Sequence, residues 1–449
     1  MDGAHQPRSF GSVSTPSTAL PRARLAGALI CLMIVLSVIH GIAGDAFPAW
    51  PAGLLAWAVG ALLFAGVVNF QRIQVAIMCL AGLAGIVLAS SSGDFGWWPQ
   101  LIEGNQAILA MLAMVTFLRL VTRTGAHVGE SLPRGAGAIE QTLLATHLLG
   151  AVINISATYI VGQRISRDGS LTPLQAKVVS RAFVAGACWS PFFASMGVVV
   201  LYVPNVDVFA VASHNFLLAA FLIAYSAWDL KADAGIDEFV GFPIHAEALI
   251  VPLLLAVLVF ALHAIPASLS ILTIIVIAAA GCFFLLRVRE PPGQTRDLLR
   301  HHMTFELSGM GAEFALFLGA AVLSAGIAAT VRVMDFAFVV DPTSAAEAIG
   351  LMCVMAGLSL VGVHPVISIA SLASLFPPVV SHPDLIAMMA LMAWSVALGA
   401  SPFSGATLAL QGRFGIPSTQ FLRWNFRYML VGLVFGSLLL TVYDRVYLP

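Results

Sequence analysis

The sequence predicts an all-α polytopic membrane protein with about 11 transmembrane helices plus two re-entrant hairpins in an inverted-topology repeat. Three observations predict this fold. The composition is too apolar for a water-soluble domain, two long apolar runs are each interrupted by a Ser-Pro pair, and lysine and arginine residues gather in alternate loops.

The composition places the chain in a bilayer. Hydrophobic residues make up 59% of its 449 residues and charged residues 10%, with a mean hydropathy of +0.96. A soluble globular domain does not reach these values. The net charge of −1 argues against a nucleic-acid partner, and the five cysteines lie in apolar segments without CxxC spacing, so neither a disulfide framework nor a metal site is indicated.

Sequence motifs of catalysis are also missing. The chain has no Walker A, HExxH, GxSxG or GxGxxG sequence in a suitable context. We therefore expect neither an ATP-driven pump nor a recognisable hydrolase, and no enzymatic activity. No cofactor is expected other than Na⁺ or H⁺ as a coupling ion.

The chain divides into five parts. Residues 1–24, rich in Ser, Pro, Gly and Arg, are expected to form a disordered cytoplasmic tail. The apolar run 25–43 is too long for a signal peptide and lacks the small-residue cleavage signal, so it is interpreted as an extra N-terminal span. Repeat 1 with its hairpin covers 44–228, a cytoplasmic linker covers 229–246, and repeat 2 with its hairpin covers 247–449. The remaining spans are expected at 54–68, 73–89, 105–121, 176–202, 207–228, 247–265, 268–286, 311–331, 385–410 and 428–442.

Two further apolar stretches, 139–165 and 345–380, have polar or proline-bearing centres, Asn154-Ile-Ser-Ala-Thr158 and His364-Pro-Val-Ile-Ser368. Each is read as a re-entrant hairpin. The positive-inside rule supports this interpretation, because the arginines at 287–300 or 413–427 would lie outside if either stretch crossed the membrane fully. Arg332 is the main exception. The assignment gives a multi-pass plasma or inner membrane protein with a cytoplasmic N-terminus and an extracytoplasmic C-terminus.

The two Ser-Pro interruptions, Ser190-Pro191 and Ser401-Pro402, lie at matching positions of the two repeats. Proline removes a backbone donor, and the backbone groups it frees in a bilayer are costly unless they line a cavity or meet a ligand. Either pair alone also fits an ordinary proline kink. Two interrupted helices at corresponding positions favour the substrate site of a secondary transporter.

The internal similarity extends beyond the breaks. Ser213-His-Asn-Phe216 aligns with Arg423-Trp-Asn-Phe426, and Glu103 aligns with Glu313. The chain crosses the membrane an odd number of times between the two Ser-Pro pairs. The two repeats are therefore expected to have opposite orientations.

This plan resembles the ion transporter superfamily, particularly its divalent anion/sodium symporters and its citrate and arsenite permeases. The resemblance covers almost the whole chain after residue 45. In the symporters a Ser-Asn-Thr motif at each hairpin tip precedes a Gly- and Pro-bearing helix break, and 154–158 followed by 186–191 is similar to that order. The second half departs from the family, because His364, Pro365 and Ser368 stand where the Asn-Thr pair is expected.

Hairpin tips and helix breaks bring half-helix N-termini toward the middle of the bilayer, where their partial positive charge favours anions. Exposed carbonyls at the same breaks can coordinate Na⁺, which we expect near Asn154 and Ser190. The alternative is that the Ser and Thr side chains only bond their own backbone or a neighbouring helix. The expected substrate-binding side chains are Asn154, Ser156, Thr158, Ser190, His364, Ser368, Ser401, Ser404 and Thr407. The expected backbone and helix-break positions are Gly186, Pro191, Pro365, Gly399, Pro402 and Gly405.

Four ionisable side chains, in addition, fall in or beside the apolar segments. His364 can take a coupling proton or be a buried structural histidine. His147, Arg119 and Arg181 are expected to reach the cytoplasmic surface along their aliphatic or ring atoms.

The leading hypothesis is a secondary active transporter that moves a small anion, a carboxylate or an inorganic oxyanion, by alternating access with Na⁺ or H⁺ as the coupling ion. An efflux permease or a channel of the same fold is an alternative. A membrane-embedded glycan polymerase or ligase is less favoured, because the outside loops are short and nearly uncharged. The expected partners are a small-molecule anion and the lipid bilayer, and a homodimer is left open.

Overall fold

The protein is described by a computed structural model that covers residues 19–122, 131–265, 269–288, 290–334, 340–377 and 379–448. These residues form helices, turns and loops, with no β-strand among them. Residues 1–18 of the expected tail lie outside the described residues. The expectation of a disordered segment up to residue 24 is wrong for 19–24, because α1 begins at Ala19. Leu20 and the alternating Ala and Arg residues favour a helix, and Pro21 is tolerated in its first turn.

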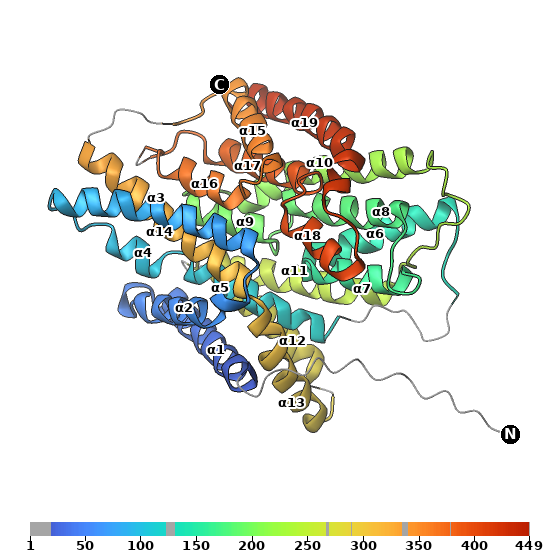
Figure 1. The fold of residues 1–449 in the computed structure, drawn as a ribbon, viewed down its shortest axis with the longest axis horizontal. Helices are drawn as coiled ribbons and strands as arrows, with labels where there is room; N and C mark the ends of the chain where they lie inside the picture. Colours follow the sequence, from blue (N-terminus) through green and yellow to red (C-terminus); the bar gives the residue numbers. More distant parts are fainter. Residues whose placement is uncertain are drawn as a thin grey trace.

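The chain alternates long helices with broken ones (Figure 1). The first half contains α1 (Ala19–Ala43), α2 (Trp50–Leu63), α3 (Asn69–Ser91), α4 (Trp98–Glu103), α5 (Gln106–Phe117), α6 (Ala136–Ile153), α7 (Ser156–Ile165), α8 (Pro173–Val184), α9 (Ala194–Tyr202) and α10 (Val208–Leu230). The second half contains α11 (Ile250–His263), α12 (Ile271–Arg287), α13 (Pro292–His301), α14 (Gly311–Met334), α15 (Ala345–Leu360), α16 (Pro365–Ala373), α17 (Pro383–Leu398), α18 (Gly405–Phe414) and α19 (Thr419–Tyr447).

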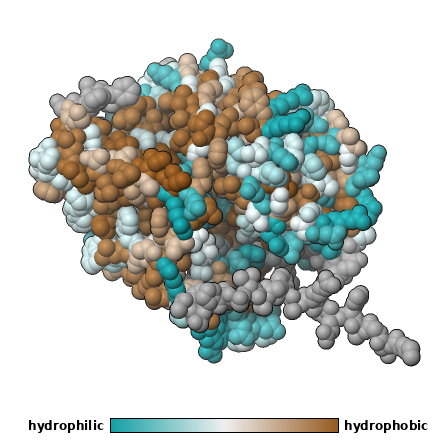
Figure 2. Space-filling model, in the orientation of Figure 1, coloured by the Kyte–Doolittle hydropathy of each residue, from teal (hydrophilic) through white to brown (hydrophobic). Residues whose placement is uncertain are grey.

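The surface matches a bilayer environment. In the described part of the chain, seven helical segments are long and apolar enough to cross a membrane, and shorter apolar helices accompany them. Figure 2 shows a broad hydrophobic surface over the left and upper parts of the molecule, with hydrophilic residues gathered at the right and bottom. The prediction of a helical, multi-pass membrane protein is thus confirmed. The helix α6 also meets the length criterion, so length alone does not distinguish a span from a hairpin arm.

The two halves use the same pairings of helices. In the first half α6 packs on α8, and α10 packs on α8, while in the second half α15 packs on α17 and α19 packs on α17. Across the halves, α3 packs on α14 and α12 packs on α5. The helix α1 has no counterpart in this scheme and packs against α2 and α5.

The helices α3 and α14 lie side by side at the left of Figure 1, and glycines let their backbones approach closely. A Cβ atom added at Gly82 would lie 2.2 Å from the Val322 oxygen, and one at Gly326 would lie 2.0 Å from the Gly82 oxygen. No side chain fits between these two backbones. The contact therefore fixes the distance between the first and second halves at this end of the molecule.

We expect Gly82→Ala and Gly326→Ala to destabilise the protein by about 1–3 kcal/mol, because the added methyl group forces the helices apart. Thermal unfolding of the detergent-solubilised protein measures the effect. Gly350→Ala, also within a helix but with no atom within 4 Å of the added Cβ, is the matched control and should not destabilise. Equal unfolding temperatures for all three variants would contradict the close contact.

Candidate functional site

The first helix break lies between α8 and α9 and is fastened to the turn between α6 and α7. The helix α8 passes into a 3-10 turn at Ala185–Cys188, and α9 begins at Ala194. In the break, the buried Ser190 hydroxyl donates to the Ala151 carbonyl of α6 and accepts from the Phe192 amide at 3.2 Å. Asn154, in the turn, has a φ of 51° and donates from Nδ2 to the Phe192 carbonyl at 3.0 Å.

The second break, between α17 and α18, repeats this arrangement. The Ser401 hydroxyl donates to the Ser359 carbonyl of α15 at 2.6 Å and accepts from the Phe403 amide at 3.3 Å. Gly362, in the turn between α15 and α16, has a φ of 101°, and a Cβ there would lie 3.3 Å from the Phe403 ring. Matching serines therefore tie each break to the preceding pair of helices.

Two buried asparagines complete the pattern. Asn215 of α10 donates from Nδ2 to the Cys188 carbonyl at 2.9 Å and to the Met388 carbonyl at 3.3 Å. Asn425 of α19 donates from Nδ2 to the Gly399 carbonyl at 2.8 Å and to the Ser180 hydroxyl at 3.3 Å. Each asparagine thus binds the break of its own half and the broken helix of the other half. The sequence alignment at 213–216 and 423–426 contains both residues but gave no role for them.

The helix segments that follow the turns and breaks pair across the two halves. The helix α7 packs against α18, where a Cβ at Gly162 would lie 2.6 Å from the Phe414 ring, and α16 packs against α9. The contact between Gly162 and Phe414 lies near the ends of α7 and α18, and each of the four helices starts at a turn or at a break. Helix N-termini carry unpaired amides and partial positive charge, so the arrangement suits an anion.

A cavity of about 570 Å³ lies between α7 and α18 and is lined by Arg119, Tyr159, Gln163, Ala409, Gly412 and Arg413. Two guanidinium groups, a phenol and an amide supply hydrogen-bond donors that suit carboxylates and oxyanions. Arg119 also pairs with Glu306 at 2.7 Å. The sequence missed Tyr159 and Arg413 as site residues, because spacing along the chain does not reveal that α7 and α18 are neighbours.

Several expected site residues cap or line the helix starts. The Ser404 hydroxyl accepts from the Thr407 amide at 3.2 Å and so caps α18. The Thr407 hydroxyl donates to the Ser401 carbonyl at 2.8 Å, and the Thr158 hydroxyl donates to the Ile155 carbonyl at 2.7 Å. Ser156, the first residue of α7, is half-buried.

The remaining expected positions fall into two groups. In the turn before α16, His364 accepts the Val366 amide on Nδ1 at 3.2 Å and contacts the Trp394 ring edge-on. The Ser368 hydroxyl is buried and has no hydrogen-bond partner in the described residues. The helix-break positions lie as follows: Gly186 in the 3-10 turn, Pro191 on an apolar cavity beside α10 and α11, Pro365 at the start of α16, Gly399 against Val184, Pro402 buried in the second break, and Gly405 in open space at the start of α18.

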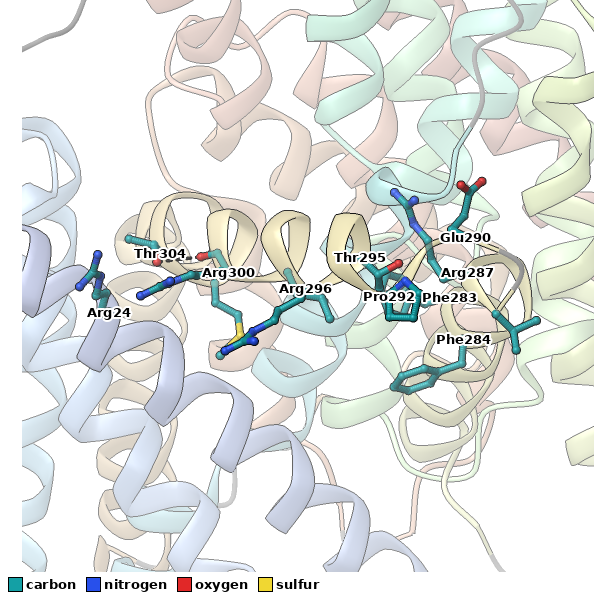
Figure 3. Close-up of a pocket in the computed structure, with 13 residues that line it drawn as sticks. Arg24, Phe283, Phe284, Arg287, Glu290, Pro292, Thr295, Arg296, Arg300 and Thr304 are labelled. Atoms are coloured by element: carbon teal, nitrogen blue, oxygen red, sulfur yellow. Dashed lines mark hydrogen bonds between the residues drawn. The ribbon is translucent and has the colours of Figure 1, made fainter.

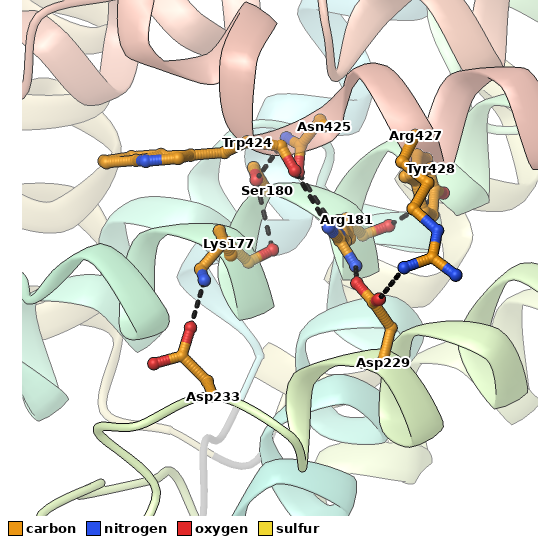
Figure 4. Close-up of polar contacts among 9 residues, drawn as sticks. All are labelled: Lys177, Ser180, Arg181, Asp229, Asp233, Trp424, Asn425, Arg427 and Tyr428. Atoms are coloured by element: carbon orange, nitrogen blue, oxygen red, sulfur yellow. Dashed lines mark hydrogen bonds and ion pairs between the residues drawn. The ribbon is translucent and has the colours of Figure 1, made fainter.

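Arg181 does not reach the surface as expected. It is 2% exposed, and its guanidinium binds the Asp229 carboxylate at 2.7 Å, the Asn425 Oδ1 at 2.8 Å and the Trp424 carbonyl at 3.0 Å (Figure 4). It also lies over the Tyr428 ring. The expectation failed because Asp229 and α19 supply every polar partner inside the protein. Arg181 therefore joins α8 and α10 to α19, and through Asn425 it reaches the second break.

A second ion pair, between Lys177 and Asp233, lies close to this cluster (Figure 4). Burial by itself raises the pKa of Asp233, but hydrogen bonds from Lys177 and from the Gly235 amide outweigh it, and the pKa lies below its ordinary value. Asp233 is therefore ionised at neutral pH, and the pair holds the segment after α10 against α8.

Arg181→Met should destabilise the protein by about 3–5 kcal/mol, because it leaves Asp229 and the Asn425 carbonyl without their buried partner. The midpoint of thermal or denaturant unfolding measures this effect. Arg181→Met combined with Asp229→Leu should recover part of the loss, since no buried charge then remains unpaired and Arg427, which also contacts Asp229 at 3.8 Å, is exposed. Lys231→Gln, which removes an exposed ion pair with Glu140, is the control and should cost less than about 1 kcal/mol. A similar small cost for Arg181→Met would contradict the assigned network.

Comparisons with known proteins do not assign this site. No protein-family model matches the chain, and no curated protein matches it. The site is therefore interpreted from its own geometry.

Proposed function

We propose that this protein is a secondary active transporter of a small anion, a carboxylate or an inorganic oxyanion, which works by alternating access. The observation that carries the proposal is the matching set of hydrogen bonds at the two helix breaks. Ser190 and Ser401, with Asn215 and Asn425, hold two interrupted helices open in the same way. An ordinary proline kink does not require matching hydrogen bonds in both halves of the chain. The substrate site of a secondary transporter, in contrast, is typically formed by interrupted helices from both repeats.

The proposed topology has about 11 spans, with α6–α7 and α15–α16 as re-entrant hairpins of opposite orientation. The short second helix of each pair, α7 or α16, supports the hairpins. The helices α7 and α16 have 10 and 9 residues. At 1.5 Å per residue, neither helix covers more than about half of a hydrocarbon core of about 30 Å. The arrangement resembles the ion transporter superfamily, and the positive-inside rule favours a cytoplasmic N-terminus.

The charge of the site favours an anion. In the proposed topology α7 and α18 start at a hairpin tip and at a helix break near the middle of the bilayer, so their N-terminal amides would face the substrate. The cavity between the later turns of these helices carries Arg413, which forms no ion pair with any described residue. Arg119 on the opposite wall is partly neutralised by Glu306. In the proposed topology this cavity opens to the cytoplasm, so it forms an entrance that concentrates anions below the helix starts.

Alternating access requires a body that moves and a body that stays. We assign α1–α5 and α11–α14 to a scaffold, joined by the close contact of α3 with α14. The helices α6–α10 and α15–α19 form the moving body, held together by the asparagine and arginine contacts described above. Because the α7–α18 cavity has Arg119 on the scaffold side, movement of the second body changes its width.

Counterflow in proteoliposomes tests the function directly. Purified protein is reconstituted with a high internal concentration of one unlabelled anion from a panel of carboxylates and oxyanions, and uptake of the labelled anion is followed. Saturable, transient accumulation of at least one anion is expected. Conductive flux without counterflow would favour a channel, and the absence of exchange for every anion would overturn the proposal.

Asn154→Ala, Ser190→Ala and Ser401→Ala should each slow anion uptake by about tenfold or more. Each substitution leaves a buried carbonyl without its donor, at a cost of about 1–3 kcal/mol, and so changes the shape of a break. Initial rates of uptake at equal amounts of reconstituted protein measure the effect. Ser437→Ala is the matched control, because the Ser437 hydroxyl bonds only its own helix at the Leu433 carbonyl. Wild-type rates in all three site variants would rule out the assigned site.

Coupling is proposed to involve His364. Its Nδ1 accepts a hydrogen bond from the Val366 amide, so Nδ1 carries no proton in this arrangement. Protonation there would break the cap of α16 and add positive charge beside the substrate. One Na⁺ near Asn154 and Ser190 remains part of the proposal, with exposed carbonyls of the first break as its ligands.

Anion uptake should therefore increase when the external side is made acidic, and His364→Asn should lose this response while retaining exchange. Asparagine can cap a helix but has no titratable group, so the variant separates the effect of capping from the effect of protonation. Uptake into proteoliposomes under imposed pH and Na⁺ gradients is the measurement. A wild-type rate that depends on Na⁺ and ignores the pH gradient would exclude proton coupling.

A further inference from the structure

A groove of about 860 Å³ lies away from the helix breaks, between α1, α12 and α13. Four arginines line it: Arg24 at the start of α1, Arg287 at the end of α12, and Arg296 and Arg300 on α13. Figure 3 shows Arg24 and Arg300 facing one another from α1 and α13. This cluster belongs to no part of the proposed transport site.

The arginines differ in how they are held. Arg287 donates to the Leu120 carbonyl at 2.9 Å, which fixes its position. Arg24, Arg296 and Arg300 are exposed and form no ion pair or hydrogen bond from their side chains to any described residue. Glu290 is the one acidic residue among those that line the groove, so the lining is strongly basic.

The floor and rim of the groove are apolar. Phe283, Leu299 and Met303 also line the groove, together with Phe284 and Val288, whose side chains are 65% and 77% exposed. Aromatic and aliphatic side chains exposed to this extent at the end of an apolar helix are typical of the boundary between the hydrocarbon core and the headgroups. The helices α1 and α12 both have their arginine-bearing ends here.

We propose that this groove binds an anionic glycerophospholipid from the membrane leaflet at this end of the molecule. Its phosphate lies among Arg24, Arg296 and Arg300, whose guanidinium groups match phosphate oxygens in pairs. Its acyl chains follow the apolar surface at Phe284 and Val288. A free phosphate ion would use the arginines but leave the apolar rim uncovered, so the groove suits a lipid better. Basic pockets at the ends of membrane helices recognise lipid headgroups in this way.

The lipid would add a contact among three elements, α1, α12 and α13. The helix α13 is a short amphipathic segment between two apolar helices, and α1 is the element without a counterpart in the other half. Binding of one phosphate by arginines from both α1 and α13 therefore stabilises the attachment of α1 to the scaffold.

The test uses the full-length protein in a neutral detergent and measures its unfolding temperature against added phosphatidylglycerol, phosphatidylcholine or inorganic phosphate. Phosphatidylglycerol should raise the unfolding temperature at concentrations where the other two do not. In the Arg296→Gln/Arg300→Gln variant the half-maximal phosphatidylglycerol concentration should rise by about tenfold or more, because two charge-assisted contacts to the phosphate are lost. Arg24→Gln is an independent variant on the opposite wall and should act in the same direction.

Arg167→Gln is the matched control, because Arg167 is an exposed arginine in the loop after α7 and does not line the groove. It should respond to phosphatidylglycerol as the wild type does. Equal stabilisation by phosphatidylcholine would show a nonspecific lipid effect, and equal stabilisation by inorganic phosphate would show an anion site without a lipid. Either result, or an unchanged half-maximal concentration in both groove variants, would overturn the proposal.

Discussion

The structure depends on how backbone groups are satisfied where two helices are interrupted. A bilayer offers no water to a free carbonyl or amide, so each break must find partners inside the protein. The chain meets this need with side chains from neighbouring helices: a serine of the break binds the carbonyl of the preceding helix pair, and an asparagine of the following helix binds the last carbonyl of the broken helix. The open helix ends that remain are then free to face a ligand.

The two buried asparagines, Asn215 and Asn425, differ in how many of their polar atoms find a partner. Asn425 accepts from Arg181 on Oδ1, whereas Oδ1 of its counterpart Asn215 is buried without a partner in the described residues. Arg181 also binds Asp229, so the asparagine at the second break is linked to charged side chains and the asparagine at the first break is not. The two breaks therefore share matching backbone contacts, but only the asparagine at the second break receives a further hydrogen bond from an arginine. The close backbone contact of α3 with α14 at Gly82 and Gly326 meanwhile fixes the distance between the two halves in the proposed scaffold.

The sequence predicted a helical membrane protein, because an apolar run of about 20 residues is typical of a membrane-spanning helix. It also placed both interruptions between the correct helices, because the effect of proline on a helix is local. It did not predict that Arg181 is buried or that Tyr159 and Arg413 share a cavity, since these facts depend on the packing of α8 against α19 and of α7 against α18. The hydroxyls of Ser190 and Ser401 were expected at a ligand, and the structure places them on backbone carbonyls, a choice that sequence spacing cannot make.

The central claim is that the starts of α7 and α18, from different halves of the chain, face one ligand. Single cysteines at Ser156 and Gly405, introduced after the native cysteines are replaced, can be labelled with a water-soluble maleimide, because Ser156 is half-buried and Gly405 has open space around it. The account predicts that a transported anion slows labelling at both positions with the same half-maximal concentration. Protection at only one position, or at neither while transport persists, would contradict it.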